Sequence, residues 1–149
     1  MKLEQEISQT TFSNNRHKAI VNLIFTYNWV YEKHSELLKP HGVTIQQFNL
    51  LRILRGQYPN PATVKLIKER MLDKMSDASR LVEKLRIKGM VDRNICPNDR
   101  RNVDVIITEK GLKLLDVIDK KQKDFNRLLL SLKSSEIDQL NLLLDKLRG

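Results

Sequence analysis

The chain is poor in several residue types that mark particular classes of protein. It has a single cysteine, Cys96, which excludes an intrachain disulfide and agrees with a reducing compartment. It has no apolar run near the roughly 20 residues that cross a bilayer, and its polar, partly acidic N-terminus lacks the apolar core of a secretory signal. A cytoplasmic protein that stays out of membranes is the simplest expectation.

The sequence also lacks the patterns that enzymes and metal sites need. With only 5 glycines it holds no phosphate-binding loop, and no nucleophile, base and orienting group gather in one motif. The histidines His17, His34 and His41 have no convergent cysteine or carboxylate set that would complete a zinc site. We therefore expect neither an enzyme, nor a bound metal, nor a cofactor.

Basic charge is what the chain has in excess. Its 149 residues include 27 Lys and Arg against 18 Asp and Glu, which gives a net charge of +9. A pI near 9.8 favours a polyanionic partner such as nucleic acid, although charge alone would also suit an acidic membrane surface. The 40% hydrophobic content is enough for the packed core of one domain.

The N-terminal part predicts a loose arm followed by a long helix. Residues 1 to about 13 are polar and have no strong periodicity. From residue 14 to residue 38, apolar side chains recur every three or four positions, which is typical of an amphipathic helix. Pro40 and Gly42 end it. Thr44 and the glutamine three residues later then form a capping-box pattern at the start of a second helix.

The middle of the chain predicts a helix-turn-helix. After the proline-containing linker 58–61, residues 62–71 form a short third helix, and Asp73 is a plausible N-cap for a fourth. Gly89 takes the position just past that helix, where a left-handed residue is common. The apolar stripe of the fourth helix consists of Met75, Ala78, Leu81, Val82 and Leu85.

Polar side chains gather at the amino end of that fourth helix, away from its apolar stripe. They are Ser76, Asp77, Ser79 and Arg80. These types suit the reading of base edges in a major groove, where arginine bonds guanine with two hydrogen bonds. An ordinary solvated face would be the favoured interpretation of a lone helix, but here the neighbouring elements complete a DNA-binding motif.

A basic hairpin follows directly. The segments 90–96 and 103–108 carry the β-branched residues of strands, and Pro97, Asn98 and Asp99 supply the turn. Arg100 and Arg101 would project from its loop. A hairpin after a helix-turn-helix is the wing of a mainly α, winged helix-turn-helix fold.

The C-terminal segment predicts two further helices. Thr108 caps the first, and Ser134 or Ser135 caps the last, whose apolar residues show a heptad-like spacing. Together with the long first helix, these segments exceed what a winged helix needs to cover its own core. The surplus apolar surface predicts a symmetric homodimer.

The run from Val43 through Gly111 resembles the MarR-type transcriptional regulators, and the likeness extends loosely to both ends. The motifs that carry it are Thr44-Ile-Gln-Gln-Phe48, Ser79-Arg80-Leu81-Val82 with Leu85 and Lys88-Gly89, Pro97-x-Asp99-x-Arg101, and Thr108-x-x-Gly111. The resemblance implies a homodimer that binds a pseudo-palindromic double-stranded operator, usually as a repressor, and is released by a small molecule or by oxidation. It divides the single domain into N-terminal dimerisation (14–42), winged-helix (43–108) and C-terminal dimerisation (109–149) segments.

The same resemblance assigns roles in the wing. Asp99 and Arg101 match a pair in which the carboxylate orients an arginine that enters the minor groove. Holding the arginine in this way reduces the side-chain entropy lost on docking, and a narrow A·T-rich groove attracts it. Asp99 can also serve simply as a turn residue. The side chains better placed to contact phosphates are Lys65, Lys74, Lys84 and Arg100.

Two further expectations concern the effector. The family implies a crevice between the dimerisation helices and the winged helix, which Tyr27, Trp29, Tyr31, His34 and Phe48 could line for a small aromatic molecule. Core packing explains these residues equally well. Cys96 is interpreted as a strand residue and not a redox sensor, because sensing branches of the family have their cysteine near the first helix, and here that region has none.

One alternative function keeps the fold. A nonspecific architectural DNA-binding or protein-interaction module would also be basic. Salt and sequence dependence separate the two, because an operator-reading dimer loses affinity with salt and still prefers its palindrome, whereas an architectural binder shows the salt dependence alone.

Overall fold

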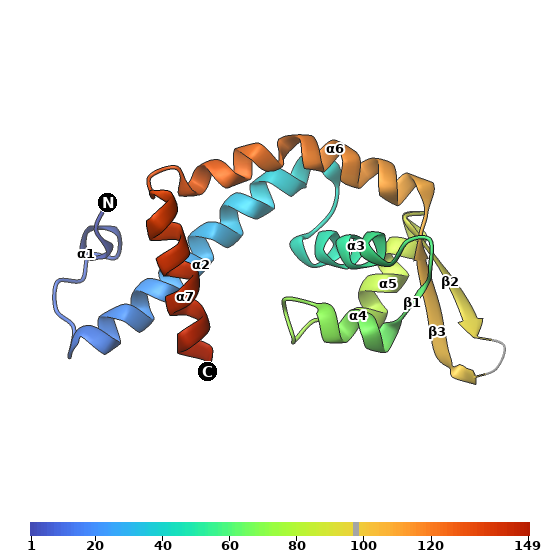
Figure 1. Ribbon diagram of the computed structural model, residues 1–149, viewed down its shortest axis with the longest axis horizontal. Coiled ribbons are helices and arrows are strands. Elements are labelled where there is room, and N and C mark those ends of the chain that lie inside the picture. The colour runs from blue at the N-terminus through green and yellow to red at the C-terminus, as the bar shows by residue number, and fades with distance from the viewer. Residues whose placement is uncertain (97–98) are drawn as a thin grey trace.

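The computed structural model describes residues 1–96 and 99–149, with side chains for all of these except 96 and 99–102. It is mainly helical and has one small antiparallel sheet. Figure 1 shows two lobes that are joined across the top by α6 (Glu109–Asn126), with both chain termini in one lobe and the sheet in the other. The predicted mainly α fold with a hairpin wing is confirmed.

The lobe that holds the sheet is the winged-helix lobe. It consists of α3 (Ile45–Gln57), β1 (Ala62–Thr63), α4 (Val64–Arg70), α5 (Ala78–Ile87), β2 (Val91–Cys96) and β3 (Asp99–Ile107). The strand order is β1-β3-β2, and all pairs are antiparallel. Residues 97–98, predicted as part of the turn, lie outside the described residues, and β3 begins at Asp99 instead of near 103.

The other lobe holds the long helix α2 (Asn15–Leu38), the short helix α1 (Leu3–Glu6) and the C-terminal helix α7 (Ser134–Arg148). Single turns of 3-10 helix, η1 (Lys39–His41) and η2 (Arg127–Leu129), follow α2 and α6. The predicted end of the first helix is confirmed, since Gly42 takes a φ of +69° there.

One core runs through the winged-helix lobe and continues into the helices above it. Leu38 of α2 and Leu115 and Ile118 of α6 are fully buried in the same cluster as Leu51 and Leu54 of α3. At about 25 cal/mol per Å² of apolar surface removed from water, such residues supply the main driving force that fixes the lobe under the long helices. The position of the winged helix is therefore set by packing on both α2 and α6.

The capping box predicted at the start of α3 is present. The Thr44 hydroxyl accepts from the Gln47 backbone N–H at 3.2 Å, and the Gln47 side chain accepts from the Thr44 N–H at 3.2 Å. Thr108 caps α6 in the predicted way and accepts from the N–H of Gly111 at 3.2 Å. Both caps satisfy backbone donors that a helix start leaves without partners.

Other helix starts differ from the prediction. The fourth helix begins at Ala78, not after Asp73, and its N-cap is Asp77, whose carboxylate accepts from the Arg80 N–H at 3.0 Å. The carboxylate of Asp73 instead accepts from the N–H of Met75 within a turn, which leaves Met75 exposed. Both aspartates have capping chemistry, and packing decides between them, because Ala78 is the first buried residue after the turn.

Three further differences come from contacts that no periodicity shows. Residues 62–63 form a strand instead of opening a helix, because Ala62 pairs with Val105 of β3. The N-terminal arm contains α1, whose Leu3 is buried and whose neighbour Glu4 pairs with Lys18 of α2. Neither predicted serine caps α7, which begins at Ser134, and the carboxylate of Glu136 accepts from the Lys133 N–H at 2.7 Å.

Candidate functional site

The helix α5 is fixed at both ends. Asp77 caps its start, and at its end the Met90 N–H donates to the Leu85 carbonyl at 3.0 Å while the Gly89 N–H donates to that of Arg86 at 2.9 Å. This pair of hydrogen bonds is the Schellman motif. It places Gly89 at a φ of +72°, as the sequence predicted. Ala78, Val82 and Leu85 are buried, so the opposite face of α5 points outward.

The outward face of α5 carries Arg80 and Lys84, which are both exposed. Ser79 is also exposed, on the flank of that face. A shallow depression of about 280 Å³ lies along the start of the helix, and its lining includes four predicted DNA-contact residues: Ser76, Asp77, Arg80 and Lys84. The Ser76 hydroxyl is buried and has no hydrogen-bond partner among the described residues.

A carboxylate on α5 is balanced by two arginines. Glu83 accepts two hydrogen bonds from Arg86, at 2.8 and 3.0 Å, and pairs with Arg93 of β2 at 3.5 Å. The hydrogen bond from Arg86 lowers the pKa of Glu83 below its usual value, and Glu83 raises the pKa of Arg86 in return. The pair with Arg93 also ties the base of the wing to α5. Sequence reasoning did not find this cluster, because Arg93 lies in another element.

Lysine side chains hold the end of α5 against the rest of the lobe. The Lys88 ammonium donates to the Gly42 carbonyl at 2.5 Å and to the Gln47 side chain at 3.2 Å. The Lys110 ammonium donates to the Lys88 carbonyl at 2.8 Å, and the Thr108 hydroxyl to the Gly89 carbonyl at 2.7 Å. These bonds give the Lys88-Gly89 pair of the sequence motif a structural role.

The remaining predicted DNA contacts lie on α4, in the turn before α5 and on β3. Lys65 is exposed on α4, and the Lys74 ammonium donates to the Glu69 carbonyl at 2.5 Å. Asp99, Arg100 and Arg101 stand at the start of β3, where Asp99 pairs with Cys96 of β2. Their side chains, and that of Cys96, lie outside the described residues.

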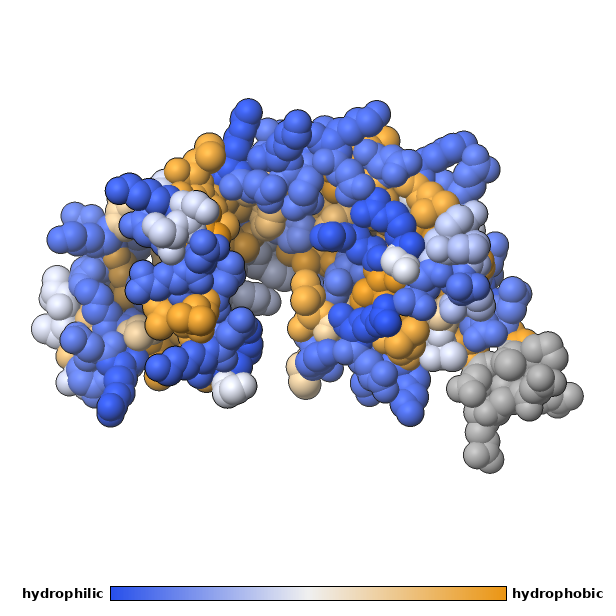
Figure 2. Space-filling view, in the orientation of Figure 1, coloured by the Kyte–Doolittle hydropathy of each residue, from blue (hydrophilic) through white to orange (hydrophobic). Residues whose placement is uncertain are grey.

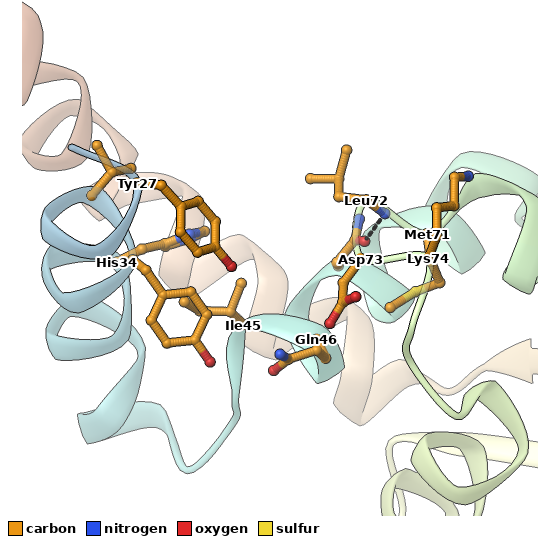
Figure 3. A pocket seen from close by; sticks show the side chains of 11 residues that line it. Tyr27, His34, Ile45, Gln46, Met71, Leu72, Asp73 and Lys74 are labelled. Atoms are coloured by element: carbon orange, nitrogen blue, oxygen red, sulfur yellow. Dashed lines mark hydrogen bonds between the residues drawn. The ribbon is translucent and has the colours of Figure 1, made fainter. Parts of the chain in front are cut away.

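A second candidate site is a cavity of about 410 Å³ between the two lobes. Figure 3 shows Tyr27 and His34 of α2 on one side and the turn Leu72–Lys74 on the other, with Gln46 of α3 below them. The lining consists of Tyr27, Val30, Tyr31 and His34 of α2, Ile45, Gln46 and Asn49 of α3, and Met71, Leu72, Asp73 and Lys74. Tyr27, Tyr31 and His34 were predicted from the sequence.

Two of the five predicted aromatic residues do not line this cavity. Phe48 is buried in the core and meets the His34 ring edge-on, with ring centroids 5.6 Å apart. Trp29 lines a different cavity, with Leu3 and Phe25. The turn and Asn49 were not predicted as part of the cavity, because only the tertiary fold brings them to α2.

The cavity wall is joined to the start of α5. The Asn49 side chain accepts from the N–H of Leu72 at 2.9 Å, and this bond fixes the turn that leads into Asp77 and α5. Leu72 is itself 84% exposed, so the turn has little packing of its own to hold it. The cavity wall and the segment before α5 are thus connected through this hydrogen bond.

His34 is a titratable side chain in the cavity wall with a partly buried ring. Its ring stacks on Phe125 of α6, with ring centroids 4.5 Å apart, and its Nε2 is buried without a hydrogen-bond partner in residues 1–96 and 99–149. Burial lowers the pKa of His34 below its usual 6.5, and the charge of Arg52 lowers it further.

This shift predicts a pH dependence of stability. Because the folded state holds His34 with a lowered pKa, it binds fewer protons than the unfolded state, so stability falls as the pH drops through and below about 6.5. We expect His34→Phe, which keeps a stacked ring, to reduce this loss. Urea denaturation between pH 7.5 and 5.5 would measure it, and parallel pH profiles for the two proteins would contradict the assignment.

Capping by Asp77 gives a second prediction. We expect Asp77→Ala to destabilise the protein by about 0.5–2 kcal/mol, because the N–H of Arg80 loses its acceptor. The exposed Ser79, two residues after Asp77, provides the control. Ser79→Ala should change stability by no more than about 0.5 kcal/mol. Urea denaturation at a fixed protein concentration measures both, and equal effects would show that the cap is not at Asp77.

In the described part of the chain, no group of three or more His, Cys, Asp or Glu side chains could hold a metal ion. None of the helices in this part is long and apolar enough to span a membrane.

The sequence and the fold of this chain are similar to those of known proteins. The profile of the MarR family matches residues 43–103. The transcriptional repressor MprA of Escherichia coli K12 is 26% identical over 117 residues, which are 78% of this chain and 66% of MprA. The chain therefore spans just under two thirds of the length of this curated relative.

Solved structures extend the likeness to nearly the whole chain. A MarR transcription factor from Planctomyces limnophilus is 29% identical with a TM-score of 0.70, covering 91% of this chain and 98% of that one. The MepR–DNA complex of Staphylococcus aureus has a TM-score of 0.74 at 20% identity and covers 92% and 97%. The winged-helix lobe, the capped α5 and the match over residues 43–103 agree, so the chain has the fold of the MarR-type winged-helix transcriptional regulators and resembles that family.

Proposed function

We propose that this protein is a sequence-specific, double-stranded DNA-binding repressor that binds a pseudo-palindromic operator as a homodimer in the cytoplasm. The match of residues 43–103 to the MarR family supports a transcriptional regulator over an enzyme. The observation that carries the proposal is the outward face of α5, where Arg80 and Lys84 stand exposed directly opposite the buried Val82 and Leu85. A helix of this kind places its polar face in a major groove.

Charge and relatives support DNA as the partner. The net charge of +9 provides the attraction to phosphates that gives nonspecific affinity, and Arg80 provides the contact type that reads guanine. The relative MprA is a transcriptional repressor, and the structural neighbour MepR was solved bound to DNA. We assign base contacts to Asp77, Ser79 and Arg80, and phosphate contacts to Lys65, Lys74, Lys84 and Arg100. The Ser76 hydroxyl, also predicted as a base contact, is buried in this conformation and is left out of this assignment.

The wing completes the proposed contact. Strands β2 and β3 bring Asp99 and Arg101 to the end of the hairpin, next to residues 97–98. We propose that Asp99 orients Arg101 for a minor groove, whose narrow A·T-rich form attracts inserted arginine. The ion pair between Arg93 and Glu83 supports this assignment, because it couples the wing to α5.

Exposed apolar side chains on the terminal helices support a homodimer. On α2 they include Ile20 and Ile24, and on α7 Leu142, Leu143 and Leu147. Figure 2 shows apolar surface over α7 in the lobe that holds the termini. An isologous interface would cover such a surface, with segments 14–42 and 109–149 as its two sides. Two copies of α5 could then meet half-sites about one DNA turn, or roughly 34 Å, apart.

The cavity between the lobes is the proposed effector site. Tyr27 and Tyr31, with ring centroids 6.0 Å apart, and His34 offer aromatic surface and polar groups to a small aromatic molecule. A ligand there would compete with the Asn49 contact to Leu72 and move the turn before α5. A small change in the spacing of the two α5 helices would release the operator, since a rigid dimer meets both half-sites in one geometry.

The first test is selection of genomic fragments by the purified protein at about physiological salt, where nonspecific phosphate binding is weakened. We expect one shared inverted repeat, and we expect Arg80→Ala protein to lose it. Equal recovery of all fragments by both proteins would overturn the proposed function in favour of an architectural DNA-binding module.

A further inference from the structure

Ile87 is an apolar side chain on the DNA-facing side of α5. At about 100° per residue it lies within roughly 20° of Arg80 and 60° of Lys84 around the helix axis. It is 72% exposed, whereas Ala78, Val82 and Leu85 on the opposite side are buried. Ile87 thus belongs to the same outward face as the two basic residues.

Packing within the chain does not account for this residue. Ile87 lies outside the core cluster. Its charged neighbours are Glu83, about 40° away on the same face, and Arg86, about 100° away, and they are engaged with each other and with Arg93 of β2. A β-branched side chain is also a poor choice for an exposed helix position on propensity alone. The apolar residues assigned to the homodimer are on α2 and α7, away from α5.

DNA offers a matching apolar group. In the major groove each base pair presents a different set of groups, and only thymine presents a methyl group, at its 5-position. An isoleucine placed against that methyl removes apolar surface from water on both partners. Against a cytosine amino group, the same side chain would displace water and supply no hydrogen bond in return.

We propose that Ile87 reads the 5-methyl group of a thymine in each operator half-site. This inference rests on the proposed function and adds a specificity residue to it. Seven residues separate Arg80 from Ile87, which at about 1.5 Å per residue is roughly 10 Å, or about three base-pair steps of 3.4 Å. The thymine should therefore lie within about three base pairs of the base that Arg80 contacts.

Replacement of single thymines by uracil in the selected operator tests this directly, because the change removes the methyl group and leaves the pairing and the groove hydrogen-bonding groups in place. We expect one thymine per half-site at which uracil weakens wild-type binding about fourfold, the value for one methylene-sized group removed from water. Ile87→Ala should bind the thymine and uracil operators equally. The variant is expected to fold, because Ile87 is exposed.

Two controls complete the design. Ile87→Val keeps a branched methyl pair and should retain part of the preference for thymine. Lys84→Ala, on the same face of α5, should weaken binding to both operators and leave the ratio between them at the wild-type value.

The inference is overturned if no thymine-to-uracil change weakens wild-type binding, or if each change weakens the wild type and Ile87→Ala equally. In either case a protein that still selects one inverted repeat retains its proposed function. Equal binding to all DNA would overturn the proposed function, and this inference with it.

Discussion

Replacing Arg80 with alanine should remove sequence preference while leaving the fold intact. We expect the preference for operator over random DNA to fall by about 1–3 kcal/mol for each half-site, which is roughly 5- to 150-fold. The helix cap should survive, because it is the backbone N–H of Arg80, not its side chain, that donates to Asp77. Binding to operator and random duplexes over a series of salt concentrations measures the change.

The control for this prediction is Lys84→Ala, one turn further along the same face of α5. A lysine at a phosphate contributes affinity without reading sequence, so its loss should weaken binding to all DNA similarly. It should also reduce the slope of log affinity against log salt by about 1. If Arg80→Ala and Lys84→Ala behaved alike on every sequence, α5 would not be the recognition helix.

Gly111→Ala should destabilise the protein by about 1–3 kcal/mol or more, the range for an added group in a well-packed place. A Cβ at this position would lie 2.5 Å from the Met90 carbonyl oxygen and 2.7 Å from Cγ1 of Ile107. The nearer contact is backbone, so the first turn of α6 would have to move off the sheet. Urea denaturation at a fixed protein concentration, with the midpoint and slope both fitted, measures the effect.

Gly56 provides the matched control, since it is a helical glycine of α3 with nothing within 4 Å of a built Cβ. Gly56→Ala should leave stability unchanged or raise it by about 0.4–1 kcal/mol, because it lowers the entropy of the unfolded chain. Loss of stability in Gly56→Ala as large as in Gly111→Ala would show that the close approach at Gly111 is not the cause.

Local chemistry in the sequence was sufficient to predict most of the elements. The three- and four-residue spacing of apolar residues predicted α2, and the Thr44–Gln47 box and Thr108 marked the starts of α3 and α6. Gly89 marked the end of α5. Such signals depend on hydrogen bonds within a few residues, so one chain segment carries all the information that they need.

The candidate site was predictable in its residue types and only partly in its arrangement. The exposure of Arg80 and Lys84 follows from the periodicity of α5, which buries Val82 and Leu85 on the other side. The choice of Asp77 over Asp73 as N-cap does not follow, because both have the same capping chemistry. Burial of Ala78 against the lobe decides it.

By itself, the sequence determined the kind of fold, the basic charge and the helix that presents Arg80, because periodicity, caps and composition are local or additive properties. Only the tertiary structure decided which distant residues meet. It buried Phe48 in the core while leaving Tyr27, Tyr31 and His34 at a cavity, and it placed Asn49 against the turn at Leu72. These contacts join elements far apart in the chain. They depend on how the helices pack, and a local sequence pattern does not predict that packing.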